Sequence, residues 1–278
     1  MRRALPPKTL LLTLALAAAA AVCCVSAHAQ VTLDVNSGSH TASASSINWT
    51  HAVGSSATNV VLLVAVSING NPIVNSVTWS GTNPTFSCLA AVGIDSSGGA
   101  LGSCGSAGSG TKLRRTEIWG AVVGTPATKS GTVTVTLSAS TAVVAGSVSF
   151  YNAAQSSAFG TGQTTVGTSP GTASLTFSGL AAIPDTIVMD SFGINSSGSG
   201  TPGGTSLWGT GANGIWGGSS DKAGTSSIGM SETATGSNFG WAYAGVPINP
   251  LTGRRRGQVI VGRLTPIDGS APPMMAAK

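Results

Sequence analysis

The acidic residues of this sequence are few enough to be weighed singly as catalytic groups. Eight Asp and Glu residues occur among 278. Two pairings, Asp185 with Asp190 and Asp221 with Glu232, would supply the two carboxylates that glycoside hydrolases use as general acid and as base or nucleophile. Neither pairing lies in a specific motif. A glycoside hydrolase or lyase on a sandwich fold is therefore the second alternative for the function.

The histidines are weaker candidates for catalytic residues than the carboxylates. His40 and His51 are the two that follow residue 29, and a Ser/His/Asp set can be assembled around them only on paper, because no spacing favours one choice. Asp34 begins a stretch like a calcium loop, but its twelfth position is Ser45 rather than the bidentate Glu. We expect no catalytic residue, metal ligand or cofactor, although a structural Ca²⁺ held by backbone carbonyls would leave no trace in a sequence.

The six tryptophans fall into two groups. Trp208 and Trp216 lie in the glycine-rich stretch 196–220, and amphipathic rings in such loops can stack on the flat faces of sugars. A carbohydrate-binding module with these two as ligand-binding residues is the first alternative. A hairpin whose two tryptophans cover the end of the core is the competing interpretation. Four others lie in strand patterns and are expected in the core: Trp49, Trp79, Trp119 and Trp241.

The N-terminus has the pattern of a cleavable signal peptide. Arg2, Arg3 and Lys8 precede the apolar run 10–22, which is too short for a typical membrane span. Ala27-His28-Ala29 then supplies small residues for cleavage before Gln30. We predict that residues 1–29 are removed, that no membrane span remains, and that the protein is extracellular or periplasmic.

Cleavage would leave two of the four cysteines, Cys88 and Cys104. An even number of cysteines in an exported chain predicts a disulfide. The bond would close a Gly- and Ser-rich loop and, through the unfolded chain, contribute about 3 kcal/mol.

Charge argues against a nucleic-acid partner. Charged residues make up only 8% of the chain, against about 25% in average globular proteins. The formal charge of +5 depends on the two ends, because residues 30–250 carry five Lys and Arg against seven acids. A slightly acidic body lacks the electrostatic footprint of nucleic-acid binding.

Strand patterns run along most of the body. The segment 60–66 is a continuous apolar run suited to a strand buried on both faces, and 132–137 alternates Thr with Val or Leu. Many short strands separated by turn residues predict an all-β, antiparallel, jelly-roll-like sandwich. We expect one domain over residues 30–250 and a flexible, basic, Pro-containing tail over 251–278. The strands are expected at 31–35, 59–68, 74–79, 114–123, 132–137, 142–151, 173–177, 186–194, 226–233 and 239–248.

Several segments together suggest a family. They are His51-Ala52-Val53-Gly54 with the run 60–67, Ser76-Val77-Thr78-Trp79, Thr116-Glu117-Ile118-Trp119, the stretch 143–150, and Trp241-Ala242-Tyr243-Ala244-Gly245-Val246. Their order resembles a bacterial extracellular β-sandwich module found in large surface proteins. The resemblance implies an extracellular location and a sandwich fold, with no catalytic residues to transfer. Our leading prediction is a non-enzymatic surface protein, adhesive or structural, with polysaccharide or cell-surface components as partners.

Overall fold

The computed structural model describes residues 29–251, apart from residues 111, 181–184, 225 and 237–239. The predicted signal peptide and tail lie outside the described residues, except for Ala29 and Leu251. Among the residues described, no helix is long and apolar enough to cross a membrane.

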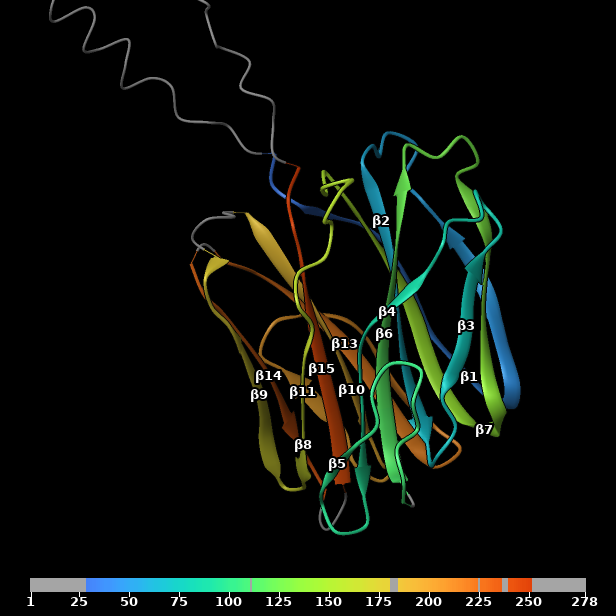
Figure 1. The fold of residues 1–278 in the computed structure, drawn as a ribbon, viewed down its shortest axis with the longest axis vertical. Helices are drawn as coiled ribbons and strands as arrows, with labels where there is room; N and C mark the ends of the chain where they lie inside the picture. The colour runs from blue at the N-terminus through green and yellow to red at the C-terminus, as the bar shows by residue number, and fades with distance from the viewer. Residues whose placement is uncertain (1–28, 111, 181–184, 225, 237–239, 252–278) are drawn as a thin grey trace, which may run out of the picture. The chain divides into compact units, whose positions relative to one another are not determined.

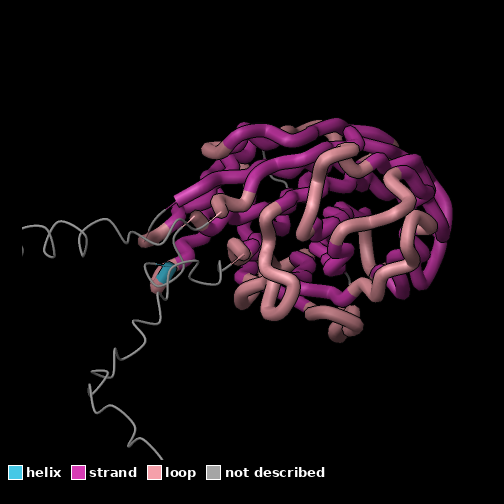
Figure 2. Tube along the Cα trace, turned by 90° about the horizontal axis from the view of Figure 1, so that it is seen from above, coloured by secondary structure: helices cyan, strands magenta, loops and turns pink. Residues whose placement is uncertain are grey.

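The described chain is built of antiparallel strands, which confirms the all-β fold (Figures 1 and 2). The first part contributes β1 (Thr32–Ala52), β2 (Val60–Asn69), β3 (Val74–Trp79), β4 (Ser87–Asp95), β5 (Ala100–Leu101), β6 (Lys112–Gly124) and β7 (Ser130–Tyr151). The second part contributes β8 (Gln163–Thr168), β9 (Gly171–Phe177), β10 (Thr186–Ile194), β11 (Gly200–Pro202), β12 (Thr205–Ala212), β13 (Ile215–Gly224), β14 (Ile228–Ala234) and β15 (Gly240–Ile248).

The two parts repeat one topology. The first part orders its main sheet β1-β7-β2-β6-β4, and the second part orders its main sheet β8-β15-β10-β13-β12. The smaller sheets also correspond, since β1 and β3 flank β7 as β9 and β11 flank β14. In the first part, β1 and β7 each run from the main sheet into the smaller one. In the second part, two strands take the place of each: β8 and β9 correspond to β1, and β14 and β15 correspond to β7. The described residues thus contain two copies of one β-sandwich, with β5 as an addition to the first.

Each copy has its own core between its main sheet and its smaller, outer sheet. In the first copy, Leu62 and Val64 of β2 pack in one cluster with Trp49 and Val133. In the second copy, Phe192 of β10 packs in one cluster with Leu175, Met230 and other apolar residues. Figure 1 shows the smaller sheets at opposite sides, with β3 on the right and β9 on the left.

A third core joins the copies. Val61 and Leu63, on the other face of β2, belong to one apolar cluster with Ile187 and Met189 of β10. β2 and β10 are therefore buried on both faces over almost their whole length. The continuous apolar run at 60–66 predicted a strand buried on both faces, and the burial of β2 confirms this prediction.

The register of β2 and β10 aligns the two copies residue by residue. Val61 pairs with Phe150 of β7, and Ile187 pairs with Ile248 of the corresponding strand β15. Counting from these pairs, Val64 of the first copy corresponds to Asp190 of the second. A carboxylate therefore stands where the other copy has an apolar core residue.

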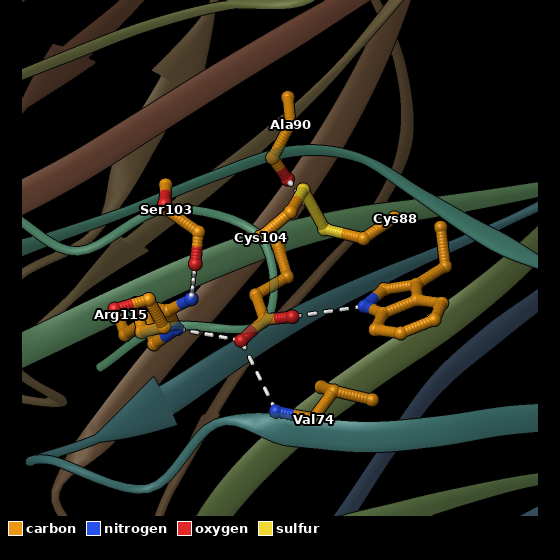
Figure 3. The surroundings of a disulfide bond; sticks show 9 residues. Val74, Cys88, Ala90, Ser103, Cys104 and Arg115 are labelled. Carbon is orange, nitrogen blue, oxygen red and sulfur yellow. Dashed lines mark hydrogen bonds and ion pairs between the residues drawn. A yellow bond between two sulfur atoms is a disulfide. The ribbon is translucent and has the colours of Figure 1, made fainter. Parts of the chain in front are cut away.

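The predicted disulfide is present in the structure. Cys88 of β4 is bonded to Cys104 in the loop after β5, with 5.6 Å between the Cα atoms (Figure 3). The same loop turns its carbonyls inward, where Ser103 O accepts a hydrogen bond from Arg115 Nη2 at 2.7 Å. The disulfide therefore holds in place a loop whose carbonyl oxygen accepts a hydrogen bond from the buried guanidinium of Arg115.

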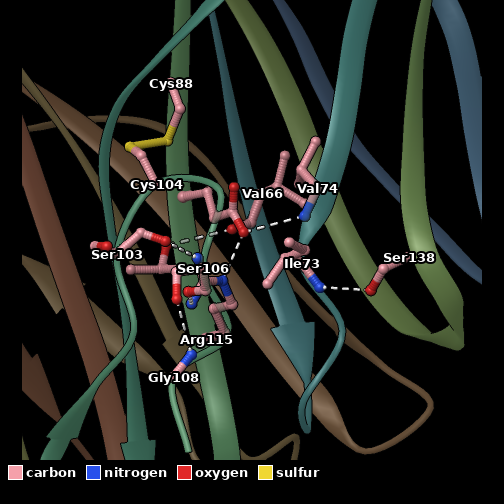
Figure 4. A network of polar contacts seen from close by, with 12 residues as sticks. Val66, Ile73, Val74, Cys88, Ser103, Cys104, Ser106, Gly108, Arg115 and Ser138 are labelled. Carbon is pink, nitrogen blue, oxygen red and sulfur yellow. Dashed lines mark hydrogen bonds and ion pairs between the residues drawn. A yellow bond between two sulfur atoms is a disulfide. The ribbon is translucent and has the colours of Figure 1, made fainter.

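Arg115 is one member of a buried ion pair on β6 (Figure 4). Its Nε donates to Glu117 Oε1, which also accepts from the backbone N–H of Val74 at 3.1 Å. The other carboxylate oxygen accepts from Trp119 Nε1 at 2.8 Å. This charged pair is well supplied with partners, which is the condition under which burial of charge is tolerated.

Replacing both cysteines with serine is expected to lower the free energy of unfolding by about 3 kcal/mol, because the unfolded chain gains loop entropy. Urea unfolding of the exported chain from residue 30 measures this, with the reduced wild-type protein as the matched control. An unchanged urea midpoint in both would mean that the loop around Arg115 is held without the bond.

Candidate functional site

The strongest cluster of chemically capable side chains lies in the core of the second copy, around Asp190. The side chain of Asp190 is fully buried. Its carboxylate accepts hydrogen bonds from the backbone N–H of Ser220, from Ser220 Oγ at 2.7 Å, and from the Tyr243 hydroxyl at 2.7 Å. The small side chains of β13 allow this approach, and Ser219 Oγ also donates to the Asp190 carbonyl. Neighbours on both adjacent strands thus hold the carboxylate.

Glu232 of β14 faces the same core from the outer sheet, with 1% of its side chain exposed. Its Oε2 is buried and has no hydrogen-bond partner among the residues described. Gly200 lies against it, since a Cβ at that position would stand 2.8 Å from Oε2. The same Cβ would meet the rings of Phe192 and Trp216 at 3.0 Å. The carboxyl group of Glu232 is therefore in mainly aromatic surroundings.

These surroundings decide the protonation of the cluster. Burial raises the pKa of Asp190 to about 7, although its hydrogen bonds oppose the shift. Burial, reinforced by the charge of Asp190, raises the pKa of Glu232 to about 9. Burial and the same carboxylate raise the pKa of Tyr243, and burial raises that of Asp221. At neutral pH Glu232 is therefore protonated and Asp190 is only partly ionised.

A pair of acids with separated pKa values is the signature of acid–base catalysis, but this pair is enclosed. Asp190 and Glu232 lie between the main and outer sheets, so a polymer substrate cannot meet them in this conformation. The structure pairs Asp190 with Glu232, which were the second members of two different predicted pairings. Asp221 of β13 pairs with Met189, which faces the core between the copies, so Asp221 lies on the other face of the sheet. Asp185 precedes β10, where its carbonyl accepts from Val31 N at 3.4 Å.

The two candidate sugar-binding tryptophans lie on opposite faces of the second copy's main sheet. Trp208, 6% exposed, belongs to the core between the copies, and a Cβ on Gly146 would stand 2.6 Å from its ring. Trp216 packs against the outer core, edge-on to Phe192 with 6.0 Å between ring centroids. Their strands do form a hairpin, but the rings do not share a platform.

His51 is buried in the first copy and does not form a triad. Its Nδ1 meets two hydroxyls, Ser37 Oγ at 2.8 Å and Ser147 Oγ at 2.9 Å, while Nε2 has no partner among the described residues. Asp34 instead accepts from Ser149 Oγ at 2.8 Å. Burial lowers the pKa of His51 to about 4, so the ring is neutral at physiological pH. Within the described part of the chain, no group of three or more His, Cys, Asp or Glu could hold a metal ion.

Glu232 makes stability depend on pH in a definite direction. The unfolded chain loses this proton near pH 4.5, whereas the folded chain keeps it to about 9, so the folded state binds more protons between these values. The free energy of unfolding is therefore expected to fall as pH rises through that window, with Asp190 adding to the fall between 3.8 and about 7.

Glu232→Gln cannot lose a proton, so its free energy of unfolding should fall less steeply from about pH 5 to about pH 9. Urea titrations across that range measure the slope. Asp95→Asn is the matched control, because the pKa of this exposed carboxyl is lowered and it is ionised throughout the window in both states. Parallel slopes in wild type and Glu232→Gln would contradict the assignment.

Comparison with other proteins adds no assignment to this geometry. No protein-family model matches the chain, and no curated protein matches it.

Proposed function

We propose that this chain is an exported, non-enzymatic protein that acts at a surface as an adhesive or structural module. One observation carries the proposal: four side chains able to do acid–base chemistry face inward. Asp190, Glu232, Glu117 and His51 are all buried, each at a core of one of the two copies. In those positions they organise packing rather than meet a substrate.

The construction of the body supports the same role. Three apolar cores, a disulfide and a buried ion pair hold the strands together. The signal-peptide pattern supports export, and the likeness of the strand segments to bacterial extracellular modules supports a place at a surface. A surface protein benefits from this rigidity, because a preorganised face loses little entropy when it binds.

Export is tested by expressing the full chain in a bacterial host and separating cytosol, periplasm and medium. The product outside the cytosol should begin at Gln30, as read by N-terminal sequencing. Its Cys88 and Cys104 should resist alkylation until a reductant is added. A product that stays in the cytosol with residues 1–29 attached would overturn the proposal.

The non-enzymatic part has its own test. The exported protein should release no reducing ends from soluble or insoluble polysaccharides beyond the buffer rate, and Asp190→Asn/Glu232→Gln should behave identically. Cleavage by the wild type that the double variant loses would instead establish a glycoside hydrolase or lyase at the buried carboxyl pair, opened by a movement of the outer sheet.

A further inference from the structure

The outer sheet of the first copy presents a regular array of polar side chains. Residues 46–50 of β1, 132–137 of β7 and 76–79 of β3 alternate outward polar with inward apolar positions. Across the three strands the outward residues pair in rows. The rows are Ser46–Thr136–Ser76, Asn48–Thr134–Thr78 and Thr50–Thr132–Ser80, the last member following β3 and exchanging hydrogen bonds with Thr132. We call these nine residues the polar array.

The polar array is firmly supported from behind. Trp49 and Trp79 pack in the core directly beneath it, beside Val133 and Val135. Both indole N–H groups are used, since Trp49 donates to Ser147 Oγ at 2.8 Å and Trp79 to the His51 carbonyl at 3.3 Å. Five members of the array are threonine, whose β-branching restricts χ1. The threonine side chains therefore have few rotamers to lose when a ligand binds.

Its chemistry selects a repeating, uncharged ligand. Neighbouring strands are about 4.8 Å apart and alternate residues about 6.7 Å apart, so the hydroxyls form a grid of those spacings. A single hydrogen bond contributes only about 0.5–1.5 kcal/mol in water, so useful affinity needs many bonds made together. None of the nine side chains carries a charge, and none is a large apolar residue of the kind that anchors protein interfaces.

We propose that the polar array binds the surface of an ordered, uncharged polysaccharide, whose hydroxyls donate and accept at regular intervals. This assignment rests on the proposed role at a surface and names the partner for it. Hydroxyl groups of the ligand form hydrogen bonds with the side chains on the outer face of β1, β7 and β3, without aromatic stacking. Binding of this kind is insensitive to salt, because no ion pair contributes to it.

The second copy supplies an internal comparison. Its outer sheet has one full row, Thr172–Thr233–Thr201. The remaining positions include Gly229, which pairs with Thr176 and has no side chain to offer. The array is complete in the first copy alone, which places the site there.

The test uses the exported protein from residue 30 with microcrystalline cellulose and crystalline chitin as probes. The wild type should be depleted from solution by at least one of them, equally at about 0.05 and about 0.5 M salt. Asn48→Ala/Thr78→Val/Thr134→Val removes the central row, and its affinity should fall by about tenfold or more. Thr172→Val/Ser174→Ala/Thr233→Val on the other outer sheet is the matched control and should bind like the wild type.

Equal thermal unfolding of the two triple variants shows that both are folded. Four results would overturn the inference: no retention of the wild type on either solid, undiminished retention of the central-row variant, loss of retention at high salt, or shaping of ice crystals in place of polysaccharide binding. If the wild type and the central-row variant still adhere equally to whole bacterial envelopes, the surface role stands and only the polysaccharide assignment fails.

Discussion

Each main sheet packs on the other main sheet and on its own outer sheet, so it must be apolar on both sides, and the rest of this molecule follows from that constraint. The faces of β2 and β10 that meet contribute Val61, Leu63, Ile187 and Met189 to the core between the copies. Their opposite faces contribute to the two other cores. The outer sheets bury one face each and leave the other to solvent. Polar side chains near the middle of the two main sheets, such as Glu117 and Asp190, are therefore enclosed, and the outer sheets present a polar face to solvent.

A polar or ionisable group that is enclosed in this way must find partners or lose its charge. The first copy surrounds Glu117 with Arg115 as an ion-pair partner and with two further N–H donors. The second copy has no cation beside Asp190 among the described residues, and its neighbour Glu232 keeps its proton. These are the two general answers to a buried carboxyl group: an ion pair with satisfied partners, or neutralisation. One topology, used twice, shows both.

The sequence predicted what depends on local pattern. The bounds of β3 and β10 were predicted to the residue, the double-sided burial of β2 was recognised, and Trp49 and Trp79 were assigned to the core. β4 and β8 were missed, because glycine and serine hide the alternation of burial, whereas β12 and β13 form the hairpin that was the competing interpretation for Trp208 and Trp216. The strand expected at 31–35 in fact extends to Ala52. Its length was not predicted, because three register shifts along β1 interrupt the alternation of apolar and polar residues.

What depends on distant pairing could not be predicted. The two copies share a strand order rather than a sequence pattern, so no repeat was visible in the chain. Asp190 and Glu232 meet only because β10 and β14 face one core, and the nearest signal was an acidic residue inside the apolar strand 186–194. The tryptophans at 208 and 216 are eight residues apart along a hairpin, but Trp216 pairs with Gly211, three residues after Trp208, so the pleat directs the two rings to opposite faces.

Calorimetric unfolding of the exported chain tests the central claim most directly, since the shared core should make the copies one cooperative unit. We expect a single transition whose calorimetric and van't Hoff enthalpies agree. Two separate transitions, one for each copy, would show that the core between them does not hold the molecule together.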